Sequence, residues 1–357
     1  MRKLLFLVPD LFGQPGGIAR YCRLVCQTLA KEYDLHVVAL ADTRTATPSA
    51  EFPAIKYQPC GGSRTLFIWQ AIRAMLVHRP DILLNGHPHF SGLCSVLAGT
   101  GRVKLVSFIY GIDVWQLLSP LRRWGLQQSD QIIAISHFTA HKGIAVNHLP
   151  PHKIQILHNC FDPKWTIPAS SQTERTGQRL LTVARISLAE QYKGHDYVLR
   201  TLPYLRPEFP EIHYDIVGDG DGRPALEAMA QELGVADMVT FHGFVSATQL
   251  QTHYQAADIF IMPSRAEGFG FVFLEAMAYG LPVIAGNQDA SPEVIVEGET
   301  GCLVDPTDVD ALTEALVNLL RDPRQRQQLG ARGKRRVQDH FSLHQFQHTL
   351  QQHLKAL

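Results

Sequence analysis

The chain has 357 residues, of which 45% are hydrophobic and 18% charged, and its formal net charge at pH 7 is zero. This length exceeds one typical hydrophobic core, so two domains are expected in a soluble globular protein. No apolar run approaches the length needed to span a bilayer, and no nucleic-acid partner is expected.

The zero net charge hides an asymmetry between the two halves. Residues 1–165 hold 17 Lys and Arg against 9 Asp and Glu, or +8, and the remaining residues hold 16 against 24, or −8. Chance could produce this pattern, but a basic first half also suits an anionic partner such as a phosphorylated lipid carrier or a membrane surface. The six cysteines follow no disulfide framework, which favours a reducing cytoplasm. We therefore expect a cytoplasmic protein, with peripheral contact at the inner face of the membrane as a further option.

Short apolar runs alternate with helical patterns in the first half of the chain. The opening residues imitate a signal peptide, but Pro9 and Asp10 end the apolar run, so a buried first strand is expected. Strands are predicted at residues 3–8, 35–39, 82–85, 105–108, 131–135 and 154–157, and helices at 18–33 and 66–79.

The second half repeats this style after a polar stretch at residues 163–178, the candidate linker. Its strands are predicted at residues 180–183, 213–217, 238–242, 259–262 and 282–285, and a last helix at 342–357. Alternating strands and helices indicate parallel sheets covered by helices, so each half is read as a Rossmann-like α/β domain. Such sheets bind ligands at the carboxyl ends of their strands.

Residues 264–285 are the most informative stretch. Gly268 and Gly270 allow a tight turn before an apolar helix, whose first amides are suited to binding phosphate. Glu267 precedes the turn, and Glu275 lies inside the helix. Carboxylates on both sides of a phosphate site can bind hydroxyls at the two ends of a nucleotide sugar.

The segment from Glu267 through Gly268, Phe269, Gly270 and Phe271 to Glu275, and on to Ala285, resembles the signature of the family 4 retaining glycosyltransferases. The resemblance implies the GT-B fold, in which two Rossmann-like domains face each other across a cleft. It predicts an acceptor-binding domain at residues 1–165, a nucleotide-sugar-binding domain at 176–340, and a helix at 341–357 that crosses back to the first domain. It also implies that the residues from Glu267 to Phe271 and Glu275 bind the donor, with Glu267 on the sugar hydroxyls and Glu275 on the ribose.

Arg185 and Lys193 match the family's pair of cations. Arg185 follows the strand at 180–183, and Lys193 is expected to start the next helix. Two fixed cations can neutralise a diphosphate leaving group, so Arg185, Lys193 and Glu267 are the predicted catalytic residues. Surface cations are the alternative interpretation. Arg185 and Lys193 make a metal ion unnecessary for this role, so we expect no metal and no cofactor beyond the UDP- or GDP-sugar that serves as co-substrate.

Two further loops resemble donor-binding elements of the family. Gly16 and Gly17 open the first helix, where the family's glycine pair packs against the donor, although a simple turn would look the same. Gly218 belongs to a Gly-x-Gly turn after the strand at 213–217.

Phe244 and Val245 resemble the segment that runs along the nucleobase. Some guanosine-using relatives carry a carboxylate two residues later, where this chain has Ala247, so a UDP-sugar is favoured over a GDP-sugar. Asp289 is read as a turn carboxylate, with donor contact as the alternative.

Three residues are expected on the acceptor side. Tyr110 stands where relatives often carry a histidine that touches the transferred sugar, and it cannot act as a base near neutral pH. Asp113 follows in the same loop, and His87 lies in the loop after the strand at 82–85. No third ligand accompanies His87 and its neighbour His89, so a metal site is not expected there.

Two stretches mix aromatic and basic residues, at 64–79 and 114–125. Burial of their apolar side chains against the sheet is the favoured interpretation, and contact with a membrane interface is the alternative.

The predicted function is retaining transfer of a hexose from a nucleotide sugar to an acceptor hydroxyl. The acceptor is expected to be a saccharide or a lipid-linked molecule, in glycolipid or cell-surface polysaccharide synthesis. A sugar-phosphate synthase or nucleotide-sugar epimerase of the same fold is one alternative, and a nucleotide-sugar-binding protein without catalysis is another.

Overall fold

The computed structural model describes residues 2–13, 16–47, 55–99, 103–162, 165 and 177–357. Most of the predicted linker at 163–178 therefore lies outside the described residues. The chain divides into two compact units, one formed by Met1–Asn159 with His344–Leu357 and the other by Cys160–Leu343.

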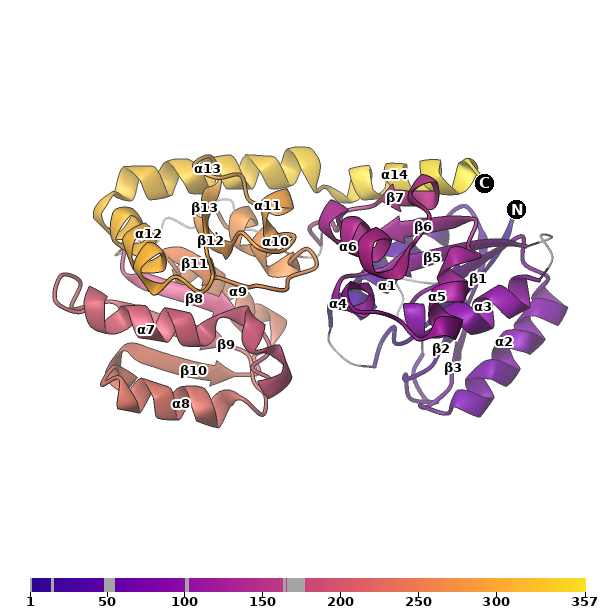
Figure 1. Cartoon of the computed structure of the whole chain (residues 1–357), viewed down its shortest axis with the longest axis horizontal. Helices are drawn as coiled ribbons and strands as arrows, with labels where there is room; N and C mark the ends of the chain where they lie inside the picture. Colours follow the sequence, from indigo (N-terminus) through magenta and orange to yellow (C-terminus); the bar gives the residue numbers. More distant parts are fainter. Residues whose placement is uncertain (1, 14–15, 48–54, 100–102, 163–164, 166–176) are drawn as a thin grey trace. The chain divides into compact units, whose positions relative to one another are not determined.

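The first unit contains a parallel sheet whose described strands follow the order β3-β2-β1-β4-β5-β6-β7 (Figure 1). The strands are β1 (Lys3–Val8), β2 (Asp34–Ala39), β3 (Lys56–Pro59), β4 (Ile82–Asn85), β5 (Lys104–Ile109), β6 (Gln131–Ala134) and β7 (Ile154–Ile156). The helices are α1 (Gly17–Leu29), α2 (Arg64–His78), α3 (Ser91–Ala98), α4 (Ile112–Trp115), α5 (Pro120–Gln127), α6 (His137–Asn147) and α14 (Leu343–Lys355), with 3₁₀ turns η1 (Pro88–Phe90) and η2 (Pro151–Lys153).

Helices cover both faces of this sheet. Leu5 and Leu7 of β1 pack in one cluster with Phe67 of α2. On the opposite face, the ring of Phe108 in β5 lies 5.8 Å from that of Tyr21 in α1. Burial on both faces explains why the strand sequences are apolar runs rather than alternating patterns.

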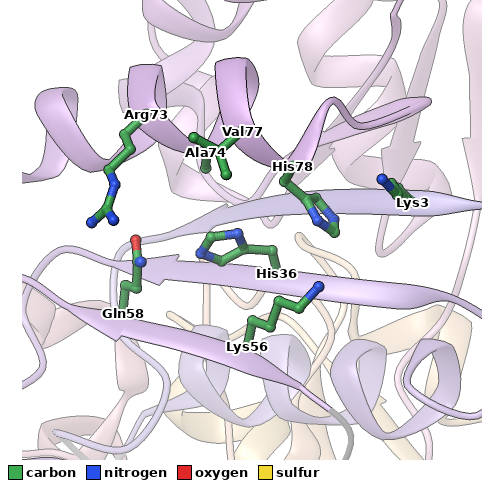
Figure 2. Close-up of a pocket in the computed structure, with 8 residues that line it drawn as sticks. All are labelled: Lys3, His36, Lys56, Gln58, Arg73, Ala74, Val77 and His78. Atoms are coloured by element: carbon green, nitrogen blue, oxygen red, sulfur yellow. The ribbon is translucent and has the colours of Figure 1, made fainter.

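Helix α2 has one buried and one exposed side. Its exposed side carries several large apolar residues, namely Ile68, Trp69, Ile72, Leu76 and Val77. The edge of the helix formed by Arg73, Ala74, Val77 and His78 borders a cavity next to the first residues of β1, β2 and β3 (Figure 2). The favoured interpretation of burial for the stretch 64–79 is therefore wrong for these five side chains.

The second unit contains a parallel sheet with the described order β10-β9-β8-β11-β12-β13. The strands are β8 (Arg179–Val183), β9 (His213–Val217), β10 (Val239–Gly243), β11 (Ile259–Met262), β12 (Val283–Gly286) and β13 (Gly301–Val304). The helices are α7 (His195–Leu205), α8 (Arg223–Glu232), α9 (Ala247–Ala256), α10 (Phe271–Ala278), α11 (Ser291–Val294), α12 (Val309–Arg321) and α13 (Pro323–His340), with 3₁₀ turns η3 (Leu188–Lys193) and η4 (Ala236–Met238).

This second sheet is also covered on both faces. Ile216 of β9 lies in one buried cluster with Leu199 of α7 and Leu316 of α12. On the other face, the ring of Phe260 in β11 lies 6.0 Å from that of Phe273 in α10. Each fully buried side chain of this kind contributes about 1.5–3 kcal/mol relative to an exposed one.

Both strand orders are those of doubly wound Rossmann-like sheets, which confirms the predicted fold class. The order reverses between β1 and β4 in the first sheet and between β8 and β11 in the second, and ligands of such sheets bind at these switch points. Strands β3 and β13 were not predicted. Lys56–Pro59 is a partly exposed edge strand without an apolar run, and Gly301–Val304 is a short edge strand that begins with glycine. No helix among the described residues combines the length and hydropathy that a membrane span requires.

Candidate active site

The loops after β8 and β11 meet at the switch point of the second sheet. The backbone N–H of Arg265, after β11, donates to the carbonyl of Tyr192 in η3 at 2.9 Å. Gly194 has φ 81°, and a Cβ there would lie 2.5 Å from the carbonyl oxygen of Pro263, so only glycine allows this close packing. Lys193 is therefore the last residue of η3, and the prediction that it starts a helix is wrong, because Gly194 separates it from α7.

This packing brings Lys193 and Glu267 together. The Lys193 ammonium donates to a Glu267 oxygen at 2.5 Å, and the two side chains are 14% and 16% exposed. Burial alone would lower the pKa of Lys193, but Glu267 and Tyr192 more than offset this effect and raise it above its ordinary value. The structure thus holds a fixed cation beside a fixed carboxylate, two residues that sequence analysis assigned to catalysis.

Asp289 holds the backbone of Glu267 in place. Its carboxylate accepts hydrogen bonds from the N–H of Glu267 at 2.6 Å and from the N–H of Ser291 at 2.9 Å. Burial raises the pKa of Asp289 to about 6. The carboxylate stabilises a turn, in agreement with the favoured sequence interpretation.

The turn between Glu267 and α10 presents backbone donors. Gly270 has φ 88° and caps α10, and a Cβ there would lie 2.4 Å from the ring of Phe273. The N–H groups of Gly268 and Gly270 have no hydrogen-bond partner among the described residues. Phe269 is buried with its ring 5.6 Å from that of Phe341, and Phe271 is partly buried. Unused amides at a helix N-terminus are the donors that bind phosphate in many proteins.

Arg185 lies after β8 with its side chain mostly exposed and forms an ion pair with Glu190. Glu190 and Tyr192 raise the pKa of Arg185, and Glu190 also contributes to the raised pKa of Lys193. No role was predicted for Glu190 from the sequence. Its position between Arg185 and Lys193 in the sequence could have indicated that it interacts with these cations.

Glu275 is buried within α10, and one of its oxygens accepts a hydrogen bond from the hydroxyl of Tyr254 in α9 at 2.8 Å. The Tyr254 ring stacks on that of Tyr279 at 5.5 Å. Tyr254 was missed because nothing in the sequence shows that α9 packs against α10. The ribose contact assigned to Glu275 stays a prediction.

The remaining donor residues of this unit lie on the loops after β9 and β10. The N–H of Gly218 donates to the carbonyl of Gly243 at 2.9 Å, which joins the two loops. Phe244 is 76% exposed, and Val245 is partly buried. An exposed aromatic ring can stack on a base or a sugar.

The glycine pair of the first unit opens a helix, as predicted. Gly16 is the N-cap of α1 and Gly17 is its first residue, in the loop after β1. The loop therefore lies at the switch point of the first sheet, next to β4.

Two predicted acceptor-side residues are neighbours in the first unit, and a third lies in the same loop. The rings of His87, after β4, and Tyr110, after β5, stack at 6.3 Å. The Tyr110 hydroxyl lies in the core, 3.7 Å from the sulfur of Cys22. Burial and the nearby His89 lower the pKa of His87 to about 3, so its imidazole is neutral near pH 7.

Asp113 stabilises the turn that starts α4. Its carboxylate accepts from the N–H of Tyr110 at 3.1 Å and from the N–H of Gly111 at 2.5 Å. Burial raises the pKa of Asp113 to about 6. Both hydrogen bonds are local, so the observed role of this carboxylate is to hold the loop.

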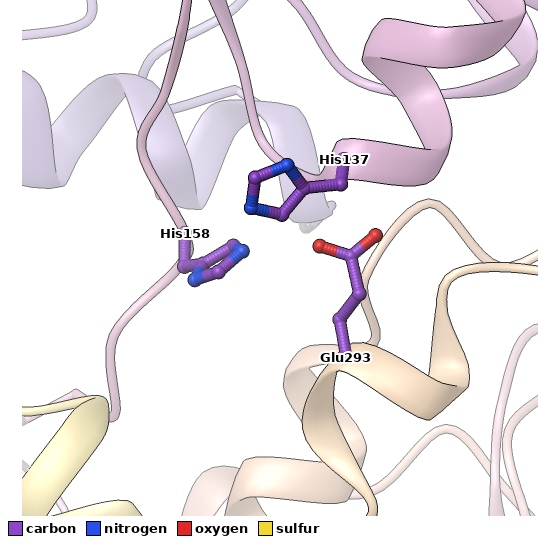
Figure 3. Close-up of side chains that lie close together, drawn as sticks. All are labelled: His137, His158 and Glu293. Atoms are coloured by element: carbon purple, nitrogen blue, oxygen red, sulfur yellow. The ribbon is translucent and has the colours of Figure 1, made fainter.

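Two groups of polar side chains contain residue types that can ligate a metal ion. Asp215, His242 and His253 have ligand atoms within 4.8 Å of one another. Arg179 also donates to Asp215, at 3.0 Å, and its positive charge opposes a cation at that place. In the first unit, the rings of His137 and His158 lie edge to face at 5.9 Å (Figure 3). Two imidazoles of one unit do not complete a metal site.

Family models cover nearly the whole chain. Residues 15–165 match the model described as Glycosyltransferase Family 4, and residues 163–336 match the model described as Glycosyl transferases group 1. The similar solved structures include Anabaena HepE in complex with UDP, with a TM-score of 0.79 and 21% sequence identity over 99% of this chain and 100% of that chain. At this identity, the likeness supports the fold alone.

Two curated relatives are similar in sequence. One is the GDP-mannose-dependent alpha-(1-6)-phosphatidylinositol monomannoside mannosyltransferase of Mycolicibacterium smegmatis, which is 34% identical over 260 residues, 68% of this chain and 67% of the relative. The other is the GDP-mannose-dependent monoacylated alpha-(1-6)-phosphatidylinositol monomannoside mannosyltransferase of Corynebacterium glutamicum, 28% identical over 96% of this chain and 94% of the relative. The chain therefore belongs to glycosyltransferase family 4 and is a glycosyltransferase with the GT-B fold.

Proposed function

We propose that this glycosyltransferase transfers a hexose from a nucleoside diphosphate sugar to an acceptor hydroxyl, and that the second unit binds the donor. The observation that carries this proposal is the ion pair of Lys193 and Glu267 beside the unused amides of Gly268 and Gly270. The cation and the amides suit a diphosphate, and the carboxylate suits the hydroxyls of the attached sugar.

The roles of the cations and amides in the transfer step follow from the negative charge that develops on the departing diphosphate. As the glycosidic bond breaks, negative charge grows on the departing diphosphate, which Lys193, Arg185 and the amides can stabilise. We propose that the departing phosphate accepts the proton of the acceptor hydroxyl, so that attack occurs on the face from which it leaves and the anomeric configuration is retained. The protein cations serve this step without a metal ion, so we expect EDTA to leave the rate unchanged.

For the donor, we propose GDP-mannose. The names of the two curated relatives support this choice. The residue that favoured uridine, Ala247, lacks a carboxylate for guanine but does not prevent other contacts to the base, such as stacking on the exposed ring of Phe244. A UDP-sugar is the competing donor.

Calorimetric titration with GDP-mannose, GDP, UDP-glucose and UDP tests the donor. We expect tighter binding of the guanosine compounds, and loss of binding in Lys193→Ala. The matched control is Arg335→Ala, which removes an exposed cation of α13 in the same unit. Binding of UDP-glucose alone would reverse the donor assignment, and binding of none of the four would contradict the proposed function.

We further propose that the acceptor is a lipid-linked saccharide or glycolipid and that α2 contacts the membrane. Its exposed side carries Trp69, which is 54% exposed, with Arg73 5.5 Å above the ring. Exposed aromatic and aliphatic side chains beside basic residues suit an interface of anionic lipids. The double variant Trp69→Ser/Leu76→Ser should bind less to anionic vesicles. Val96→Ser, at an exposed position of α3, is the control, and equal binding of all variants would contradict the contact.

A further inference from the structure

A cavity of about 230 Å³ lies between one edge of α2 and the first residues of β1, β2 and β3 (Figure 2). The residues predicted to bind the sugar donor and the acceptor substrate lie at the opposite ends of the strands, in the segments that follow their carboxyl ends. The cavity is therefore separate from the proposed active site, and nothing in the glycosyl transfer uses it.

His36 of β2 is one of two buried histidines that line this cavity. It is only 8% exposed, yet neither of its ring nitrogens has a hydrogen-bond partner in the described part of the chain. The Oε1 atom of Gln58 in β3 is likewise buried without a hydrogen bond of normal geometry to a described residue, although the Gln58 side chain is near enough to His36 to affect the pKa of its imidazole. A buried polar group without a partner costs about 1–3 kcal/mol, so a ligand or water that bonds to it is favoured.

The other polar side chains around the cavity are mainly cationic. Lys3, Lys56 and Arg73 line it from three different elements (Figure 2). Neither the Lys3 ammonium nor the Arg73 guanidinium makes a hydrogen bond with a described residue, and the guanidinium lies 5.5 Å from the centre of the Trp69 ring.

Carboxylates compensate only part of this charge. Asp34 bonds to the Lys56 ammonium at 3.0 Å, and Asp81 accepts from the backbone N–H of Lys3 at 2.8 Å. His78 is already engaged, because its Nε2 lies 3.2 Å from the carbonyl of Leu4. Three cations against two carboxylates oppose a metal cation and favour an anion.

We propose that this cavity binds a phosphate monoester group, with His36 as a buried donor and Lys3 and Arg73 as the cations that contact the phosphate oxygens. The volume is below the 300–1,000 Å³ or so that is usual for drug-sized ligands, which suits a single phosphate with a small substituent. Such a group occurs on soluble metabolites and on the headgroup of phosphatidic acid, and α2 would place the cavity near lipid if it contacts a membrane.

The test follows the ring resonances of His36 by NMR during titration with inorganic phosphate. The protein carries Lys193→Ala, which weakens phosphate binding at the donor site, and the resonances are assigned with His36→Gln. We expect saturable shifts. Lys3→Gln/Arg73→Gln should weaken the affinity about a hundredfold, or about tenfold for each lost charged hydrogen bond. Both cations are exposed, so these variants should fold, and the melting temperature checks this.

Arg64→Gln is the matched control, because Arg64 is an exposed cation at the other end of α2 and does not line the cavity. It should leave the phosphate affinity unchanged. The proposal is wrong if the His36 resonances do not shift with phosphate. It is also wrong if Lys3→Gln/Arg73→Gln binds phosphate with the affinity of the protein that retains both cations.

Two further titrations separate the sources of the phosphate. Glycerol phosphate represents a soluble ligand, and vesicles with phosphatidic acid are compared with vesicles of equal charge made with phosphatidylglycerol, a diester. A loss in the double variant that is specific to phosphatidic acid identifies a lipid headgroup, whereas loss of glycerol phosphate binding alone identifies a soluble ligand. Binding of GDP-mannose should be unchanged in Lys3→Gln/Arg73→Gln, because both residues lie outside the proposed donor site, so this result is independent of the proposed function.

Discussion

Replacing Lys193 by Met should lower both the stability and the rate. The change leaves the Glu267 carboxylate, which is only 16% exposed, without its cation. Removing one member of a buried pair costs about 3–5 kcal/mol, and some water access here favours the lower end, about 3 kcal/mol. For a unit of this size, that loss lowers the melting temperature by roughly 6–12 °C.

The double variant Lys193→Met/Glu267→Gln separates stability from catalysis. With both charges removed, most of the lost stability should return, because no uncompensated charge remains buried. Turnover should stay at least about a hundredfold below that of the wild type, since the cation that stabilises the departing diphosphate is still missing.

Differential scanning calorimetry and initial rates with a radiolabelled donor measure the two effects. The control Arg335→Met, which removes an exposed cation of α13, should change neither the melting temperature nor the rate. If the double variant is no more stable than Lys193→Met, the two residues are not coupled. If Lys193→Met retains the full rate, the assigned role of the cation in catalysis is wrong.

Two other substitutions test the supports of the site. Tyr254→Phe removes the donor to Glu275 and should cost about 1–3 kcal/mol by chemical denaturation. Tyr254→Phe should also raise KM for the donor. The control Tyr204→Phe, at an exposed position, should change neither stability nor KM. An unchanged KM in Tyr254→Phe would argue against a donor contact by Glu275. Asp289→Asn tests the raised pKa: the folded protein keeps the Asp289 proton up to about pH 6 while the unfolded chain loses it near pH 4. The stability of the wild type relative to Asp289→Asn should therefore fall by about 2–3 kcal/mol as pH rises from about 4 to 6, and a constant difference would refute the assigned pKa.

Local sequence patterns predicted the elements that carry the site. Ile259–Met262 is a continuous apolar run because its strand is buried on both faces, and the paired glycines after it mark the turn before α10. Such patterns involve residues that are close in the sequence, so they can be recognised without knowledge of the fold. The edge strand Lys56–Pro59 was not predicted, because a partly exposed edge strand needs no apolar run.

Short-range patterns were thus enough to predict the two Rossmann-like domains, the family and the residues of its motifs, since each depends on neighbours within a few positions. Which distant groups meet depends instead on how the folded chain packs. This packing paired Lys193 with Glu267, placed Asp289 under the backbone of Glu267, and joined Tyr254 to Glu275. It also left His36 buried beside α2, with no hydrogen-bond partner among the residues that the structure describes. These contacts join residues from separate strands and helices, and their distances are set by how the elements pack, which no local pattern records.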